Sequence, residues 1–186
     1  KVLIHQFVTI QENGRPVKMS TRKANFISLN DLIEEVGSDV VKFFFSMRGI
    51  NTHLNFDLDL AKDQSDQNPV FYIQYAHARA VNIILKSKNE KIFSYDIFNH
   101  NLLIEEEEIT LIKNLIEFPD LINKSIIDME PQLISNYLMD IASKFHHYYS
   151  KHKVITNNKE LSNARAILVD CIRQVLFKGL KVLGIS

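Results

Sequence analysis

The stretch from Asn68 to Lys86 constrains the fold most, because it carries helix signals and two distinct faces. Asn68 is a good N-cap, and Pro69 suits the first helical position, where its missing N–H group costs no hydrogen bond. Helical spacing predicts an apolar face suited to a core, formed by Val70, Ile73, His77, Ala80 and Ile84. A second face is first aromatic and then basic, and it consists of Tyr72, Tyr75, Arg79, Asn82 and Lys86.

Tyrosine rings followed by cations on one helix face have two interpretations. Unstacked bases need aromatic surfaces and their phosphates need cations, so the face suits a single-stranded nucleic acid. A half-buried helix gives the same pattern when its tyrosines lie at the core boundary with their hydroxyl groups in water. The stripe alone does not decide between the two, so the rest of the chain must.

The composition limits the classes of partner and compartment. Lysine and arginine together number 22, as do aspartate and glutamate, so a site for a polyanion has to be a local patch. Cys171 is the only cysteine, which excludes an internal disulfide and predicts a reducing, cytoplasmic location. Apolar runs stay shorter than a membrane span, so we expect no membrane association. Lys1 opens the chain within a predicted strand, so we expect a piece of a longer protein.

Amphipathic segments in the second half predict further helices. One buried stripe is predicted by helical spacing at Ile134, Leu138, Ile141, Phe145 and Tyr148. Tyr149 and His152 lie one step round, at the edge of that stripe. We expect Pro119 to break an earlier helix in two, Ser162 to cap the last helix, and Cys171 to face the core. Four or five such helices with short links predict an α-helical bundle.

The segment from Lys18 to Asn25 is short and strongly basic. Its cations include Lys18, Arg22 and Lys23, and Ser20 contributes a hydroxyl group. A basic loop with hydroxyl and backbone N–H groups suits a polyphosphate. A Walker loop is excluded, because its glycine pattern is missing. A solvated basic hairpin has the same composition, so composition leaves both interpretations open.

Longer motifs carry a family resemblance. The segment KMSTRKANFISLNDLIEEVG resembles the signature-loop region of class I aminoacyl-tRNA synthetases, and its KMSTR stands at the place of their KMSKS-type motif. Similarity to arginyl-tRNA synthetases in particular extends over QYAHAR, NYLMDIASKFHHYY and VLFKGLKVLGIS, and it covers essentially the whole chain. Two positions depart from the pattern. Thr21 replaces the second lysine of the motif and Ala24 replaces a common glycine, so Arg22 or Lys23 would supply the second cation.

The resemblance implies a mainly α-helical chain in two parts. Residues 1–66 are expected to form the end of a Rossmann-type catalytic domain, with a short β-hairpin, the signature loop and a helical connector. Residues 67–186 are expected to form the anticodon-binding helical bundle of class Ia synthetases. Periodicity independently predicts the bundle, but the division between the parts rests on the resemblance.

The resemblance also implies an activity and its residues. A parent arginine–tRNA ligase would use ATP and Mg²⁺ to activate arginine and would transfer it to tRNA(Arg). The expected residues at the ATP phosphates are Lys18, Ser20, Arg22 and Lys23. Contact with tRNA is expected at Tyr72, Tyr75, Arg79, Asn82, Tyr149 and His152. The HIGH-type motif of the family is missing, so we expect this chain alone to bind no cofactor and to be inactive. We also expect the parent to be a monomer.

Other hypotheses are a non-catalytic RNA-binding helical module derived from a synthetase, and a helical protein–protein adaptor. The retained KMSTR motif favours the enzyme, because a pure binding module does not need it. We expect no zinc site at His146, His147 and His152, because adjacent side chains on a helix point about 100° apart. His77 lies on the apolar face and is expected to be a hydrogen-bonded core histidine.

Overall fold

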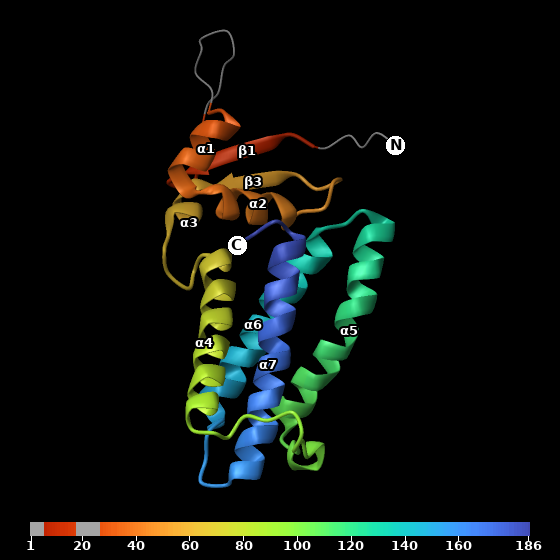
Figure 1. Ribbon diagram of the computed structural model, residues 1–186. Helices are drawn as coiled ribbons and strands as arrows, with labels where there is room; N and C mark the ends of the chain where they lie inside the picture. The colour runs from red at the N-terminus through yellow and green to blue at the C-terminus, as the bar shows by residue number, and fades with distance from the viewer. Residues whose placement is uncertain (1–5, 18–26) are drawn as a thin grey trace.

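The computed structural model describes residues 6–17 and 27–186. A small sheet and short helices form one end of an elongated molecule, and long helices form the other end (Figure 1). None of the helices in the described ranges is both long enough and apolar enough to cross a membrane. The predicted class, a mainly helical chain with a small β element before a bundle, is confirmed.

The described strands form one sheet in the order β2–β1–β3. Their bounds are Val8–Glu12 for β1, Arg15–Pro16 for β2 and Leu54–Asp57 for β3. β1 and β2 make the predicted hairpin, with Asn13 and Gly14 at positive φ in its turn. β3 runs parallel to β1 and places Phe56 beside Ile10, a pairing that the sequence pattern did not predict.

Three short helices accompany this sheet, and they are Leu29–Val36 (α1), Ser38–Ser46 (α2) and Leu58–Lys62 (α3). α2 and α3 pack on the strands, and α1 packs on α2 and α3. Ser28 begins α1 with a capping box, in which its hydroxyl accepts from the Asp31 N–H at 3.2 Å and the Asp31 carboxylate accepts from the Ser28 N–H at 2.7 Å. Gly37 separates α1 from α2 at a φ of 87°, which favours glycine. α3 follows β3 directly, and Asp57 caps it.

The bundle consists of Pro69–Asn89 (α4), Glu106–Asp128 (α5), Gln132–Lys151 (α6) and Lys159–Val182 (α7), with a short 3₁₀ turn, His100–Leu102 (η2), before α5. α7 packs against the other three long helices, and α4 and α5 lie on opposite sides (Figure 1). Buried Asn68 caps α4 as predicted and also donates to the carbonyls of Ala61 and Asp63. The predicted division at residues 66 and 67 falls in this connection and stays a prediction.

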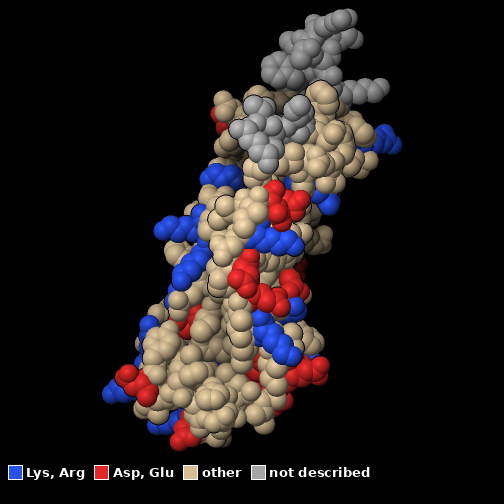
Figure 2. All heavy atoms as spheres, turned by 90° about the vertical axis from the view of Figure 1, so that its right-hand side faces the viewer, with Lys and Arg blue, Asp and Glu red and all other residues tan. Residues whose placement is uncertain are grey.

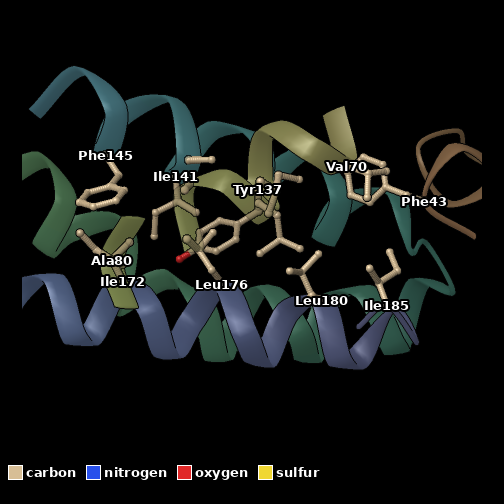
Figure 3. Close-up of a cluster of buried hydrophobic side chains, with 14 of the residues drawn as sticks. Phe43, Val70, Ala80, Tyr137, Ile141, Phe145, Ile172, Leu176, Leu180 and Ile185 are labelled. Atoms are coloured by element: carbon tan, nitrogen blue, oxygen red, sulfur yellow. The ribbon is translucent and has the colours of Figure 1, made fainter. Parts of the chain in front are cut away.

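The core fills the space between the long helices and extends into the sheet end of the molecule, where Phe43 of α2 belongs to it (Figure 3). The predicted α6 stripe is confirmed, since every member is buried. The predicted inner face of α4 is confirmed for Val70, Ile73, Ala80 and Ile84. Burying one such large side chain fully contributes about 1.5–3 kcal/mol, so these faces hold the bundle together.

The predicted break at Pro119 is wrong, because α5 continues through the proline. Contacts from α6 support this stretch. The Tyr137 hydroxyl donates to the carbonyl of Asn114 at 2.9 Å, and its ring stacks on Phe118 with centroids 5.5 Å apart. Tertiary contacts therefore offset the hydrogen bond that proline removes from a helix interior.

The prediction that Ser162 caps the last helix is also wrong. α7 begins earlier, where the Asn158 side chain accepts from the Leu161 N–H at 3.1 Å. Ser162 is buried inside the helix, and its hydroxyl donates to the Asn158 carbonyl at 2.8 Å. A serine one turn into a helix gives the same sequence signal as a cap, so the pattern misled the prediction.

Two further side chains differ from expectation. Cys171 is exposed, because the buried stripe of α7 runs through its neighbour Ile172. His77 is half-buried against Phe177, but its Nε2 has no hydrogen-bond partner in the described part of the chain. Burial, together with the charge of Arg173, lowers the pKa of His77, so the neutral ring is the favoured form.

Candidate nucleic-acid interface

α4 and α6 pack along their apolar faces, and this packing brings their polar edges together. Tyr75 and Arg79 lie one turn apart on α4, so their side chains project from the same edge. His146 and Tyr149 lie three residues apart on α6 and face them. The four side chains form what we call the Arg79 cluster.

The guanidinium of Arg79 lies at the centre of this cluster. Its Cζ atom is 4.5 Å from the ring centroid of Tyr75 and 4.9 Å from that of Tyr149. One of its nitrogens, Nη2, donates to the Tyr75 hydroxyl at 2.8 Å. Tyr75 and Tyr149 as whole residues nevertheless remain 55% and 41% exposed, which leaves surface on which a base can stack. The sequence predicted these three residues as a group, and the structure brings them together.

His146 completes the cluster and was not among the predicted site residues. Its Nδ1 lies 2.7 Å from Nη1 of Arg79, its ring stacks on Tyr75, and Tyr72 contacts it edge-on. Burial lowers the pKa of His146, and the positive charge of Arg79 lowers it further. Its position three residues before Tyr149 was the sequence signal that could have identified it.

Two neighbouring hollows adjoin the cluster, and we call the two together the groove between α4 and the end of α6. The smaller has a volume of about 270 Å³ and is lined by Tyr75, Arg79 and exposed Asn82. The larger, about 480 Å³, is lined by residues 150–155. Ile83, Lys86 and Tyr149 line both, so the two hollows are neighbours.

The cations along this groove differ in how their charge is compensated. Lys86 lies 3.9 Å from Glu90, and Lys151 lies 2.6 Å from a carboxylate oxygen of Glu107. Among the described residues, neither Arg79 nor Lys153 is in a salt bridge. An uncompensated cation beside exposed rings is what a phosphate needs, so the groove suits a single-stranded nucleic acid.

Comparison with known proteins assigns the fold around this groove. Residues 73–186 match the family described as the DALR anticodon binding domain. The chain belongs to this family. Two relatives named arginine–tRNA ligase come from Desulfotalea psychrophila and Salinibacter ruber. They are 46% and 47% identical over 100% of this chain, which covers 34% and 33% of their lengths. The chain therefore spans about a third of these curated relatives.

A solved structure supports the same assignment. It comes from a Campylobacter jejuni protein assigned as an arginyl-tRNA synthetase, with a TM-score of 0.81 and 26% identity. The similarity covers 98% of this chain and 39% of the other. The sheet and short helices before the bundle are therefore part of the shared architecture, although the DALR match itself begins inside α4.

His152 of this DALR family member occupies a different environment from the rest of the predicted tRNA-binding set. It lines the larger hollow, but its Nε2 lies 3.0 Å from Glu107 of α5, and its ring stacks on Tyr148. Hydrogen bonds from Lys151 and then His152 lower the pKa of Glu107 to about 2. The contact between His152 and Glu107 thus connects the end of α6 to α5.

The α5 side of the DALR bundle lacks the features of the groove. Basic and acidic side chains are interspersed on it (Figure 2). A larger hollow of about 830 Å³ lies between α5 and α7, and Ile112, Phe118, Leu168 and Val175 give it a mainly apolar lining. It contains none of the predicted site residues. Within the described ranges, no three metal-ligating side chains gather. The Nε2 atom of His147 lies 3.8 Å from a carboxylate oxygen of Glu107.

The four residues predicted at the ATP phosphates are Lys18, Ser20, Arg22 and Lys23, and they lie outside the described residues. Their assignment therefore stays a prediction from the sequence.

Proposed function

We propose that this chain binds the anticodon loop of tRNA(Arg) as part of an arginine–tRNA ligase. The observation that carries the proposal is the guanidinium of Arg79 held between Tyr75 and Tyr149, at a groove between two helices of an anticodon-binding family. We infer arginine as the amino acid from the names of the relatives, and we infer an unpaired loop as the ligand from the exposed rings and cations of the groove.

Stacking and charge would divide the recognition between them. A base stacked on an aromatic ring contributes about 1–3 kcal/mol, which the half-exposed rings of Tyr75 and Tyr149 can supply. The phosphates of a splayed loop would meet Arg79 and Lys153, whose charges no described carboxylate neutralises. Asn82 and Lys86 would extend this contact along α4, with Tyr72 and His152 supporting it at the sides.

The ligase activity would use the signature loop of residues 18–23. Its cations, on Lys18, Arg22 and Lys23, and its hydroxyl groups, on Ser20 and Thr21, suit a polyphosphate chemically. ATP bound with Mg²⁺ supplies an activated phosphate for the carboxylate of arginine. We propose that Lys18 stabilises the negative charge that builds on the departing pyrophosphate.

A substitution in the longer protein tests this role of the loop. Lys18→Ala is expected to slow arginine-dependent ATP–pyrophosphate exchange by the equivalent of about 2–4 kcal/mol, because the contact strengthens in the transition state. Binding of tRNA should change little. Unchanged exchange with weakened tRNA binding would make Lys18 an RNA contact instead.

Binding of tRNA(Arg) to the 186-residue chain tests the proposed function directly. Changes to the anticodon loop should weaken binding by about tenfold or more, the scale of one lost stacking or base contact. Changes to the acceptor end of the tRNA are the control and should have little effect on this bundle. Equal affinity for tRNA(Arg) and an unrelated tRNA at physiological salt would reject anticodon recognition.

A further inference from the structure

The contact between Arg79 and His146 fixes the protonation state of the histidine. A guanidinium has only N–H donors, so the Nδ1 atom 2.7 Å from it must be the acceptor and carries no proton. The proton of the neutral ring is then on Nε2, which lies 3.5 Å from the carbonyl oxygen of Tyr72. The contact exists only while the imidazole is neutral, because an imidazolium would oppose N–H to N–H and charge to charge.

The surroundings of His146 come from three segments. α4 contributes Tyr72, Tyr75 and Arg79, and α6 itself contributes Tyr149, whose ring centroid lies 4.9 Å from the Cζ atom of Arg79. Burial is the largest effect on His146 and lowers its pKa, and the charge of Arg79 acts in the same direction. The hydrogen bond to the Tyr72 carbonyl and the negative charge of Asp66, in the connection before α4, raise the pKa by less, so that it stays lowered. Neutral His146 is therefore the form that holds Arg79 near neutral pH.

We propose that His146 is a positioning residue that holds Arg79 between the two tyrosines for RNA binding, and that its protonation releases Arg79. The inference rests on the proposed function, since it concerns the affinity of the same groove. Among the described residues, two of the five N–H donors of Arg79 are used, by His146 and Tyr75, so the held guanidinium can still donate to a ligand. Fixing its orientation in advance removes an ordering cost from binding.

The sign of the pH dependence separates this role from simple electrostatics. Protonating a histidine beside an RNA groove adds positive charge, which by itself strengthens binding to phosphate as pH falls. Release of Arg79 has the opposite effect. We expect the affinity of the chain for tRNA(Arg) to fall about tenfold as His146 protonates, which is about 1.4 kcal/mol and typical of a lost hydrogen bond to a charged group.

Affinity at fixed ionic strength, measured between about pH 8 and pH 5 where histidine titrates, tests the proposal with three variants. In His146→Asn, a side-chain oxygen near the position of Nδ1 accepts without titrating, so affinity should stay high and the step should vanish. In His146→Leu the acceptor is absent, so binding should be weak throughout. His147→Asn is the matched control on the exposed side of α6 and should keep the step.

Nitrogen NMR of the His146 ring supplies a readout that needs no RNA. The free chain should show the Nε2–H tautomer and a pKa below the ordinary value of 6.5. A proton on Nδ1, wild-type binding by folded His146→Leu, or a step that survives in His146→Asn would each overturn the inference. If His146→Leu does not fold, His146→Asn and the tautomer decide. Absence of tRNA binding by the wild-type chain at every pH would overturn the proposed function and this inference with it.

Discussion

Arg165 and Arg79 each belong to a cluster with tyrosine in the same bundle, but only one of them lies in a closed ion pair. The Arg165 side chain is 8% exposed and donates from Nε to the fully buried Glu108 carboxylate at 2.7 Å. It also donates to the carbonyl of Lys153 at 2.9 Å, and the Tyr148 hydroxyl donates to Glu108. Burial, and then the charge of Glu108, raise the pKa of Tyr148, so its hydroxyl stays a donor.

The Arg79 cluster has neutral partners where Arg165 has a carboxylate. Tyr75, Tyr149 and His146 orient the guanidinium through ring faces and nitrogen or hydroxyl acceptors, without cancelling its charge. A buried carboxylate commits an arginine to internal structure, since neither partner can be removed without leaving the other unpaired. Neutral partners at a groove leave the charge available to an external anion.

The largest expected effect is the loss of the buried ion pair. Arg165→Ala leaves the Glu108 carboxylate buried without its partner, and it should reduce the free energy of unfolding by about 3–5 kcal/mol. Urea denaturation of the chain measures this loss. The double variant Arg165→Met with Glu108→Leu is the control, and it should be less destabilised than Arg165→Ala because no charge stays buried. If Arg165→Ala unfolds like wild type, Arg165 and Glu108 do not form a buried ion pair that stabilises the fold.

Local periodicity explains which parts of the fold could be predicted. The apolar faces of α4 and α6 followed from helical spacing, because each stripe is a property of a few consecutive turns. The pairing of β3 with β1 joins segments far apart in sequence, and no local pattern encodes it. Glu108 is buried in α5, and its partner Arg165 lies 57 residues later, so no local pattern joins the two. Pro119 failed as a break for the same reason, since α6 supports the helix there.

The candidate site shows the same limit. Tyr75 and Arg79 could be grouped because they share one helix edge, and Tyr149 because it lies at the edge of another stripe. Packing of α4 on α6 then brought the two edges together. His146 was missed. Its place three residues before Tyr149 put it near the same edge, but its contact with Arg79 depends on the height at which the two helices pack. The RNA-binding role of the predicted residues stays a prediction.

Substitutions in the Arg79 cluster are expected to change the affinity for tRNA(Arg) rather than the stability of the fold. Tyr75→Ala and Tyr149→Ala should each weaken tRNA(Arg) binding by about 1–3 kcal/mol, because each removes a stacking surface. Their unfolding temperatures should change little, since the two side chains are 55% and 41% exposed. Tyr149→Phe keeps the ring and is the matched control. If affinity and stability fall together, or neither falls, the tyrosines are structural and the contrast with Arg165 disappears.

The salt dependence of tRNA binding by Arg79→Ala tests whether the charge of Arg79 is available to a phosphate, unlike that of Arg165. If Arg79 meets a phosphate, its removal should weaken binding and reduce the slope of log K against log salt by about one. Lys124→Ala removes an exposed cation of α5, away from the groove, and should leave both quantities unchanged. Weaker binding with an unchanged slope would instead show that Arg79 contacts a base or only orders the two tyrosines.

The smallest expected effect on stability concerns Glu107, because its ion pairs are partly exposed. Its pKa in the folded chain is lowered from 4.5 to about 2, chiefly by hydrogen bonds from Lys151 and His152. A lowered carboxylate pKa stabilises the fold above pH 4.5, and this stabilisation is lost as the pH falls toward 2. Glu107→Gln should therefore unfold at a lower temperature than wild type near neutral pH, and the difference should shrink toward pH 2. A difference that widens in acid contradicts the assignment.

The same variant converts a compensated cation at the groove into an uncompensated one. In Glu107→Gln, Lys151 loses the carboxylate oxygen at 2.6 Å and becomes comparable with Arg79 and Lys153. If the carboxylate is what separates a structural cation from an RNA-binding one, tRNA binding should acquire a steeper salt dependence even though the fold becomes less stable. A tRNA titration at several salt concentrations measures the slope, and Glu106→Gln, one position away on α5, is the matched control. An unchanged slope would mean that the geometry of the Arg79 cluster, rather than its uncompensated charge, determines where RNA binds.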